Sequence, residues 1–333
     1  MKLGIIGTGY IAGVVLPVLK NLKIDVRAIA ATPRSEEKMR SLLAEYGIPR
    51  GFTSTEEMLA AEDAGGALVD TVYIAAPNSL HYQLAKEALL AGRHVIVEKP
   101  FASNLKEAEE LAALSIRQNR MIMEAISTLY LPDYQKVKEL LPEIGDVRIV
   151  SCNFSQYSSR YDAFLKGDVK PAFDPAKSGG ALMDLGVYNI HYIVGLFGRP
   201  AAVHYTANMA GGIDTSGILT LGYDGFSAVS IAAKDCKAPC FSQIQGTKGM
   251  IVQHSAANSC EGVTLTGNSG ESVSFREEVP HRLAPEFERF RKMIDEDDTD
   301  AYPANLRHSL IVMSVLDEAR KSAGIRFPAD DLK

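Results

Sequence analysis

The sequence predicts an α/β protein in two parts: a doubly wound parallel sheet, followed by an α+β part with a mostly antiparallel sheet. Three observations predict it. Short β-branched runs alternate with segments of helical periodicity up to about residue 124. A glycine-rich segment, Gly7-Thr-Gly9, stands between the first strand and the first helix. From residue 147 onward, short strand-like runs follow one another between glycine-containing turns, as in an antiparallel meander.

Length, charge and cysteine pattern exclude several classes of protein. With 333 residues, the chain is long enough for two domains. Its formal net charge of −6 argues against binding to nucleic acid or to an anionic membrane surface, and no apolar run is long enough for a membrane span. The four cysteines include no C-x-x-C pair, so we expect a reduced, cytoplasmic protein without a metal site. We also expect no signal peptide, because the N-terminus lacks a charged region and a cleavage site.

The first predicted strand, Met1–Ile6, runs into Gly7-Thr-Gly-Tyr-Ile-Ala12, the G-x-G-x-x-A form of the dinucleotide-binding fingerprint. Gly7 permits the tight turn, Gly9 lets a pyrophosphate approach the backbone, and Ala12 lets helix and strand pack closely. The helix that follows offers N–H groups to the phosphates at its N-terminus. The predicted cofactor-binding residues of this motif are Gly7, Thr8, Gly9, Tyr10 and Ile11.

The end of the second predicted strand, Ile24–Ala31, indicates which nicotinamide cofactor is bound. A NAD enzyme normally carries Asp or Glu there to bind the ribose hydroxyls, but this chain has Ala30-Ala-Thr-Pro-Arg34, and Asp25 lies at the opposite end. Without an acid to repel it, a 2′-phosphate can pair with Arg34 and accept a hydrogen bond from Thr32. The alternative is that Arg34 caps the loop and stacks on adenine, which suits either cofactor. We favour NADP, with NAD as the alternative.

The remaining elements of the first part continue the alternation of strand and helix. Ser35–Tyr46 is a predicted helix that ends at Gly47, and Thr53–Ala61 is a second one that begins with the capping box Thr53-x-x-Glu56. The later predicted elements are a strand over Asp70–Ala76, a helix over Leu80–Leu90, a strand over Val95–Val97, a helix over Leu105–Gln118 and a strand over Met121–Glu124.

Two successive strands end in polar residues at what we expect to be one edge of the sheet. The β-branched run Val95–Val97 is typical of a buried parallel strand, and Pro100 ends it. This strand presents Glu98 and Lys99 at its carboxyl end, where open α/β sheets bind ligands. The strand before it runs into the polar loop Pro77-Asn-Ser-Leu-His81. Taken alone, the acid and the lysine could be an ordinary ion pair at a strand end.

The segments Gly7-x-Gly-x-x-Ala12, Ala76-Pro-Asn-Ser-Leu-His81 and Glu98-Lys-Pro100, in this order and spacing, resemble the Gfo/Idh/MocA oxidoreductase family. A fourth segment, Gly179–His191, is similar to the family's second signature, in which an aspartate is followed four residues later by histidine or tyrosine. The resemblance covers nearly the full chain. The tyrosine at position 188 is similar to that of members resembling dihydrodiol dehydrogenase and glucose-fructose oxidoreductase, whereas inositol dehydrogenases have histidine.

The resemblance implies two domains: an NAD(P)-binding Rossmann domain over residues 1–124, and a domain for substrate binding and oligomerisation over residues 125–333. The second domain is implied to contain a large open, mostly antiparallel sheet, and a homodimer or homotetramer formed through it. The strand-like runs are Val147–Tyr157, Ala201–Met209, Thr215–Tyr223, Ala228–Ala233, Phe241–Gln245, Met250–His254, Val263–Thr266 and Ser272–Phe275. The helices Ala284–Asp295 and Pro303–Ala323 are predicted to close the chain.

Three polar residues of the fourth segment suggest the chemistry. In a helix from Ala181 onward, Tyr188 and His191 lie four and seven positions after Asp184, so all three share one face. Interconverting an alcohol and a ketone needs a proton removed or supplied as hydride moves to or from the nicotinamide. The resemblance implies that Lys99 and the residue at position 188 carry this role. We favour Tyr188 as proton donor, with Lys99 polarising the carbonyl oxygen and Asp184 orienting both, while the reverse assignment of Lys99 and Tyr188 stays open.

Each of these residues has a structural alternative. Asp184 could be a satisfied buried helix residue, Tyr188 a core aromatic, and His191 a packed structural histidine. The polar segment after the first strand of the second domain contains Tyr157 and Arg160, which suit a polyhydroxylated substrate but also an exposed loop. The resemblance further assigns to the cofactor site Ala76, Pro77, Asn78, His81, Glu98 and Lys99.

Together these observations predict an NAD(P)-dependent oxidoreductase acting on a secondary alcohol or carbonyl of a sugar, polyol or cyclic diol. One alternative is a glycosidase of the same fold that uses tightly bound NAD for transient oxidation. The other is a non-catalytic NAD(P)-binding regulator, but the joint presence of Lys99, Asp184 and Tyr188 counts against it. The expected partner is a small carbohydrate-like molecule, not a nucleic acid or a membrane.

Overall fold

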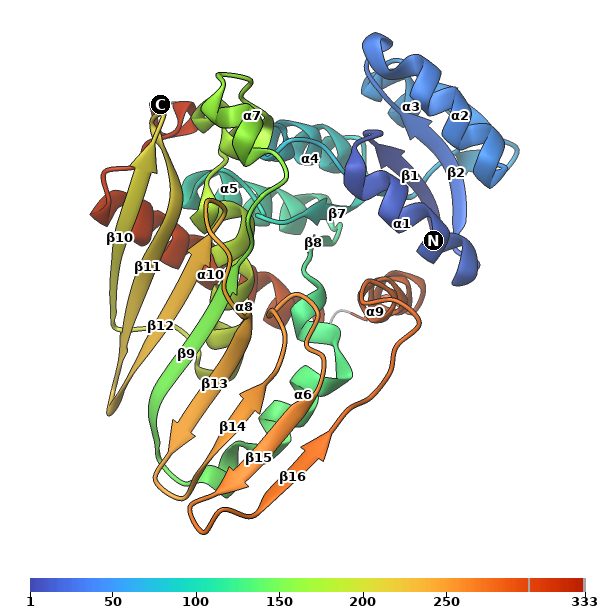
Figure 1. Ribbon diagram of the computed structural model, residues 1–333. Coiled ribbons are helices and arrows are strands. Elements are labelled where there is room, and N and C mark those ends of the chain that lie inside the picture. The colour runs from blue at the N-terminus through green and yellow to red at the C-terminus, as the bar shows by residue number, and fades with distance from the viewer. Residues whose placement is uncertain (299, 332–333) are drawn as a thin grey trace. The chain divides into compact units, whose positions relative to one another are not determined.

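The computed structural model describes residues 1–298 and 300–331. The chain forms two compact units: the first contains Met1–Ala125 and Leu283–Arg307, and the second contains Ile126–Arg282 and the chain from His308 onward (Figure 1). The chain first passes from one unit to the other after Ala125, one residue later than the boundary predicted after residue 124. The segment Leu283–Arg307 was predicted to belong to the second domain, but it packs within the first unit.

Long-range contacts explain why this late segment joins the first unit. The ring of Phe287 packs edge-on against Tyr73, with ring centroids 5.4 Å apart. Arg291 donates a hydrogen bond of 2.8 Å to the carbonyl oxygen of Leu22, and the Tyr302 hydroxyl accepts one of 3.2 Å from the backbone N–H of Ile122. Such pairings between distant parts of the chain leave no local sequence pattern.

The first unit is built on a six-stranded sheet in the order β3-β2-β1-β6-β7-β8, with every pairing parallel. The strands are β1 Lys2–Ile6, β2 Asp25–Ala30, β3 Arg50–Phe52, β6 Thr71–Ile74, β7 His94–Glu98 and β8 Ile122–Ala125; β4 Glu62–Asp63 and β5 Gly66–Ala67 form a small separate hairpin. The helices are α1 Tyr10–Asn21, α2 Glu36–Tyr46, α3 Thr55–Ala60, α4 His81–Leu90, α5 Leu105–Gln118 and α9 Ala284–Asp295.

The order of this sheet determines where a ligand binds. The chain moves outward from β1 to β2 and β3, and then returns to the other side of β1 with β6, so the strand order reverses between β1 and β6. Doubly wound sheets bind ligands at the carboxyl ends of the strands beside such a reversal. The register pairs Ile74 with Val97 and Val97 with Glu124, so β6, β7 and β8 end level with one another.

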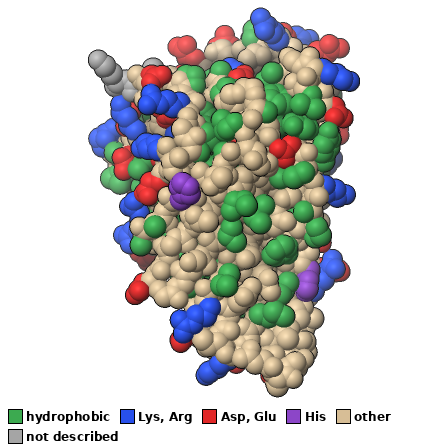
Figure 2. Space-filling view, turned by 60° about the vertical axis from the view of Figure 1, so that its left-hand side comes forward, with side chains coloured by type: hydrophobic (Ala, Val, Ile, Leu, Met, Phe, Trp, Pro, Cys, Tyr) green, Lys and Arg blue, Asp and Glu red, His purple; other side chains and the backbone are tan. Residues whose placement is uncertain are grey.

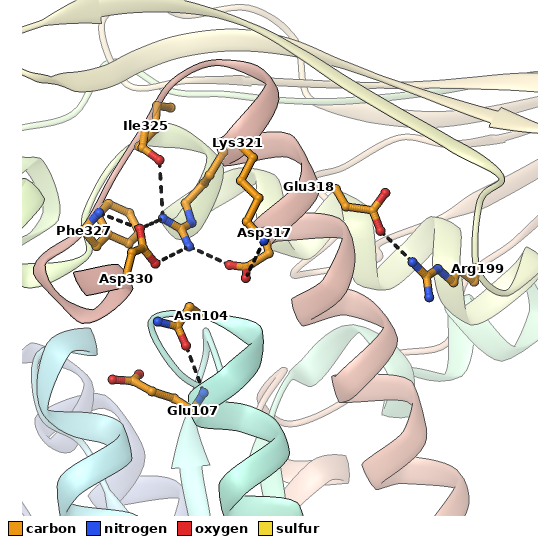
Figure 3. Close-up of polar contacts among 10 residues, drawn as sticks. Asn104, Glu107, Arg199, Asp317, Glu318, Lys321, Ile325, Phe327 and Asp330 are labelled. Carbon is orange, nitrogen blue, oxygen red and sulfur yellow. Dashed lines mark hydrogen bonds and ion pairs between the residues drawn. The ribbon is translucent and has the colours of Figure 1, made fainter. Parts of the chain in front are cut away.

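Helix ends follow the sequence signals with one correction. Gly47 ends α2 in the left-handed conformation, with φ of 68°, as predicted. The capping box predicted at Thr53 is wrong, because Ser54 is the cap of α3 and its side chain accepts a hydrogen bond from the N–H of Glu57. Asn104 caps α5 in the same way through the N–H of Glu107 (Figure 3).

The second unit contains an eight-stranded sheet in the order β10-β11-β12-β9-β13-β14-β15-β16. Its pairings are antiparallel except for β12 with β9. The strands are β9 Val147–Ser155, β10 Ala202–Ala210, β11 Ile213–Tyr223, β12 Phe226–Ala233, β13 Phe241–Gly246, β14 Gly249–Gln253, β15 Val263–Gly267 and β16 Ser272–Phe275. The other helices are α6 Pro132–Leu140, α7 Tyr161–Leu165, α8 Val187–Phe197 and α10 Tyr302–Ser322. The predicted fold class is therefore confirmed.

Side chains on the central strands of this sheet alternate between a buried and a more exposed face. On β11, Leu219 and Leu221 are buried and belong to the core of the unit. Ile218, the residue before Leu219, points to the other face and is 47% exposed. Ile149 on β9 is similarly exposed, at 46%. The buried face packs against α8 and α10 (Figure 1). No helix among the described residues has the length and apolar character needed to cross a bilayer.

The end of the described chain is fixed to α10 by a buried arginine. The guanidinium of Arg320 donates hydrogen bonds of 2.6 Å to Asp317 and 2.8 Å to Asp330, and lies 4.3 Å from the centre of the Phe327 ring (Figure 3). The Arg320 side chain is 2% exposed. Because breaking a buried ion pair leaves a charge unpaired at high cost, this cluster holds the last segment against the helix.

Candidate active site

The loop after β1 has the geometry of a phosphate-binding turn. Gly7 has φ of +109°, and a Cβ there would lie 2.4 Å from the carbonyl oxygen of Ala75, so only glycine fits. Helix α1 begins at Tyr10, and its N-cap residue Gly9 offers no side chain to the first backbone N–H groups. These N–H groups and the helix dipole suit an anion. The predicted motif residues, including buried Thr8, therefore fit the phosphates of a dinucleotide.

The described residues 31–35, which follow the end of β2, include no acid. Thr32 stands just before a short 3₁₀ turn, Pro33–Ser35, and Arg34 lies within it; both side chains are exposed. Asp25 lies at the other end of the strand and binds Arg27, with 2.7 Å between the Asp25 oxygen and the Arg27 nitrogen. The next acid along the chain is Glu36, whose Oε1 accepts a hydrogen bond of 2.6 Å from Arg40.

His81 joins the two loops that follow β6 and β7. Its Nδ1 lies 2.8 Å from the carbonyl oxygen of Pro100 and its Nε2 lies 2.9 Å from that of Ala76. The side chain is fully buried, and burial lowers the pKa of His81. Both ring nitrogens thus contact the backbone, so His81 is placed to fix the loop that begins Ala76-Pro77-Asn78 relative to Lys99, which precedes Pro100.

Two buried residues beside Lys99 were not predicted from the sequence. The hydroxyl of Tyr73 donates a hydrogen bond of 2.5 Å to Oε1 of Glu98, so this carboxylate is held from the neighbouring strand. Glu124 is 4% exposed on β8, opposite Val97 of β7. An acid in an otherwise apolar predicted strand is a signal that could have indicated Glu124. The contact of Tyr73 with Glu98 depends on the register between β6 and β7, which the sequence does not show.

Asp184 lies in a π-helical turn, Leu182–Gly186, that precedes α8. The prediction of a regular helix from Ala181 is therefore wrong over its first turn, where the backbone is wound more widely than in an α-helix. The Oδ2 of Asp184 accepts a hydrogen bond of 2.8 Å from Nζ of Lys234, the residue after β12. Such π turns within helices are frequent at functional sites.

Tyr188 and His191 follow on α8 in different environments. Tyr188 is 8% exposed, and its ring lies 6.0 Å from that of Phe154 on β9. His191 is fully buried, and its Nδ1 lies 2.9 Å from Nε2 of His308 on α10. Burial, together with the nearby His191 and Lys138, lowers the pKa of His308 well below its ordinary value. This contact fits the structural alternative for His191.

The predicted substrate loop is exposed and partly ordered by its own side chains. Tyr157 is 47% exposed; its hydroxyl donates a hydrogen bond of 2.7 Å to Asp162, and its ring packs edge-on against Tyr161. Arg160 is exposed immediately before α7. A contact of Tyr157 or Arg160 with substrate stays a prediction.

The predicted site residues thus fall into two groups, one in each unit. The first unit brings together the phosphate loop, the Ala76–His81 loop and Lys99 at the carboxyl edge of its sheet. The second unit places Asp184 and Tyr188 on consecutive turns at the start of α8. The first group is suited to a dinucleotide, and the second supplies a carboxylate and a phenol.

Comparison with known proteins shows the family of the chain. Residues 1–126 match the family described as “Oxidoreductase family, NAD-binding Rossmann fold”, and residues 134–252 match “GFO/IDH/MocA C-terminal domain”. The chain belongs to the Gfo/Idh/MocA oxidoreductase family. The family predicted from its motifs is confirmed, and the protein is an NAD(P)-dependent oxidoreductase acting on hydroxyl or carbonyl groups.

Several members of the family are similar over the full length. The scyllo-inositol 2-dehydrogenase (NADP(+)) IolU of Bacillus subtilis is 36% identical over 333 residues, covering 99% of each chain. The trans-1,2-dihydrobenzene-1,2-diol dehydrogenase of Xenopus tropicalis is 27% identical, covering 98% of this chain and 99% of its own. The fold is shared with the 3-ketoreductase KijD10 of Actinomadura kijaniata, with a TM-score of 0.83, 22% identity and 97% of each chain covered.

Proposed function

We propose that this enzyme transfers hydride between NADP and a ring carbon of a cyclic polyol, cyclic diol or sugar, interconverting a secondary alcohol and a ketone. The observation that carries the proposal is the presence of Asp184 in the π turn before α8 and Tyr188 in the first turn of α8, in a chain whose strand β7 is followed directly by Lys99. The names of the relatives support the substrate class, because scyllo-inositol and dihydrobenzenediol both carry secondary hydroxyls on a six-membered ring.

The nicotinamide, when bound, supplies or accepts the hydride. The residues of the chain handle the proton and the charge. In the reducing direction, Tyr188 gives its phenolic proton to the carbonyl oxygen, and the ammonium of Lys99 stabilises the negative charge that develops there. Asp184 orients the two groups. In the oxidising direction the same groups take the proton from the alcohol. Which of Lys99 and Tyr188 touches the proton first is tested by the variants described in the Discussion.

A preference for NADP is the second part of the proposal. Exposed Arg34 and Thr32 follow β2, and two acids of this region bind other arginines: Asp25 binds Arg27 and Glu36 binds Arg40. A 2′-phosphate there meets a cation and a hydroxyl, and the segment directly after β2, residues 31–35, contains no carboxylate. The printed name of the Bacillus subtilis relative, which includes NADP, supports the same choice.

We also propose that a second copy of the chain covers the exposed face of the eight-stranded sheet and that the protein acts in the cytoplasm. A shallow apolar groove lies at one end of strands β10, β11, β12 and β9, and hydrophobic side chains gather on this face (Figure 2). An uncharged, apolar face suits a self-complementary contact between copies. The free thiols of all four cysteines support a reducing compartment.

The purified enzyme with inositols, aldoses and trans-diols, offered with NADP and with NAD, tests the function. We expect stoichiometric formation of reduced nicotinamide with at least one ring alcohol, faster with NADP. Cleavage of a glycoside without net reduction, by protein that retains NAD through purification, would show instead that the enzyme is a glycosidase. Cofactor binding without turnover on any of these substrates would favour a regulator.

A further inference from the structure

Lys234 is a buried lysine in the interior of the second unit. It follows the last residue of β12 and is 1% exposed. Its backbone N–H donates to the carbonyl oxygen of Thr215 at 2.8 Å, and its carbonyl oxygen accepts from the N–H of Ser158 at 2.9 Å. These bonds continue the pairing of β12 with β11 on one side and with β9 on the other. The backbone of Lys234 is therefore fixed at the end of β12, between β11 and β9.

The Nζ of Lys234 contacts a backbone carbonyl, a carboxylate and an aromatic ring. It donates a hydrogen bond of 2.6 Å to the carbonyl oxygen of Ala172 and one of 2.8 Å to Oδ2 of Asp184, and it lies 4.3 Å from the centre of the Phe173 ring. The Lys234 side chain is 2% exposed, whereas that of Asp184 is 32% exposed. The pair thus has an inner cation shielded from water and an outer carboxylate that water and a substrate can approach.

A second carboxylate lies within the field of the same ammonium. Asp214 is buried, and its Oδ2 accepts hydrogen bonds of 2.7 Å from the N–H of Leu182 and 2.9 Å from the hydroxyl of Tyr205. Burial raises the pKa of Asp214 to about 6, and the charge of Lys234 opposes that rise. The π turn is therefore held at its first residue by Asp214 and at Asp184 by Lys234.

We propose that Lys234 is a positioning residue of the reaction: it fixes the carboxylate of Asp184 in one orientation and keeps it ionised beside the reacting groups. The proposal rests on the proposed function, because it acts through Asp184. A buried ion pair is weak evidence of a stabilising role, since well-packed apolar side chains can often replace it without loss. Here a long apolar side chain could also pack on Phe173. The geometry is better explained by control of the charge and direction of Asp184.

The test compares Lys234→Met, Lys234→Arg, Asp184→Asn and the double variant Lys234→Met/Asp184→Asn with the wild type. Thermal unfolding and NADPH binding are measured first, and kcat and KM are then measured across pH. Lys237→Met serves as the control, because Lys237 is an exposed lysine three residues along the same loop.

We expect Lys234→Met to bind NADPH as the wild type does and to lower kcat by about tenfold or more, with the acidic limb of its pH profile moved to higher pH. Lys234→Arg should recover part of the rate. The double variant should be no slower than Asp184→Asn, since Lys234 acts through that residue. Lys237→Met should match the wild type. If Lys234→Met does not fold, Lys234→Arg decides, because it keeps the charge but changes the direction of the donor: a wild-type kcat and pH profile in it would overturn the positioning role.

The outcomes separate the inference from the proposed function. A wild-type rate in Asp184→Asn would overturn the proposed role of Asp184, and the inference with it. A slow Asp184→Asn beside a Lys234→Met variant with wild-type kcat and pH profile would overturn the inference alone. Additive losses in the double variant would show that Lys234 acts independently of Asp184, which also overturns it.

Discussion

At the scale of single residues, the choice of cofactor depends on one arginine and on an absent acid. We expect Arg34→Ala to weaken NADP binding by about tenfold or more, because it removes a charge-assisted hydrogen bond to the 2′-phosphate. NAD binding should hardly change. Titration of both cofactors measures the effect, with Arg40→Ala on α2 as the matched control, since Arg40 already binds Glu36. Equal losses for NADP and NAD in Arg34→Ala would contradict the 2′-phosphate assignment.

Lys99 and Tyr188 should behave as one acid/base unit. Tyr188→Phe removes only the hydroxyl, so packing against Phe154 survives, while loss of general acid catalysis lowers kcat on the order of a hundredfold. Lys99→Met should abolish turnover without preventing NADPH binding. Because groups that act together are non-additive, the double variant should be scarcely slower than the worse single one.

The measurement for this pair is kcat/KM of all four proteins across pH. A Tyr188→Phe variant with a near wild-type rate and an unchanged pH profile would assign the acid role to Lys99 alone. Fully additive losses would mean that the two groups work independently.

The sequence indicated the residues that end strands or occupy motifs, and it missed those that act through a neighbouring strand. Lys99 and Gly7 stand in recognisable patterns. Tyr73 was missed because its bond to Glu98, 25 residues away, depends on the register of β6 and β7. Lys234 could have been found, because it and Asp235 are charged residues directly after an apolar strand, the same signal that indicated Glu98 and Lys99.

At the scale of elements, the start of α8 is set by contacts that no periodicity shows. Gly180, just before it, has φ of +109°, and a Cβ there would collide with Oδ1 of Asp214. The same carboxylate accepts from the N–H of Leu182. An α-helical spacing of Asp184 and Tyr188 was predicted, whereas the backbone forms a π turn first. The wider turn arises from these tertiary bonds and not from residue propensity.

Asp214 should make stability fall with pH over a narrow range. Its pKa is raised by burial from 3.8 to about 6, so the folded state binds a proton more tightly than the unfolded state. Protonated Asp214 contributes its full stability when the pH is below the pKa of Asp214 in the unfolded state. This contribution is lost as the pH rises through the pKa of Asp214 in the folded state. Relative to Asp214→Asn, the free energy of unfolding of the wild type should therefore fall between about pH 4 and 6 and be level above.

Denaturant unfolding of both proteins at a series of pH values measures this difference. Tyr205→Phe is the matched variant, because the Tyr205 hydroxyl bonds the ionised carboxylate and lowers the pKa of Asp214. Removing it should move the fall to higher pH. A difference that rises with pH through this range would show that Asp214 is ionised more easily in the folded state than in the unfolded one.

At the scale of the whole molecule, the patterns of strand and helix predicted the class of each sheet, and the family resemblance implied the size of the second. The parallel sheet follows from β-branched runs separated by helices, and the antiparallel one from short runs separated by glycine turns. The membership of Leu283–Arg307 in the first unit could not be predicted, because it depends on contacts such as Phe287 with Tyr73 across more than half the chain. A helix pattern reports which face is apolar, not which sheet that face covers.

The exposed face of the second sheet gives the last prediction. Ile218 is 47% exposed at the middle of β11, and the register places Ile231 of β12 beside it. If a second copy covers the face, Ile218→Lys would bury an ammonium in an apolar contact. The free-energy cost of burying this charge far exceeds the free energy that the lost apolar contact contributed. The wild type should sediment as a dimer or tetramer and Ile218→Lys as a monomer with an unchanged far-UV spectrum. Ile116→Lys, at a 69% exposed isoleucine on α5 of the first unit, should keep the wild-type assembly. A wild type that is monomeric at every concentration, or an Ile218→Lys variant that assembles normally, would show that this face is not the interface between copies.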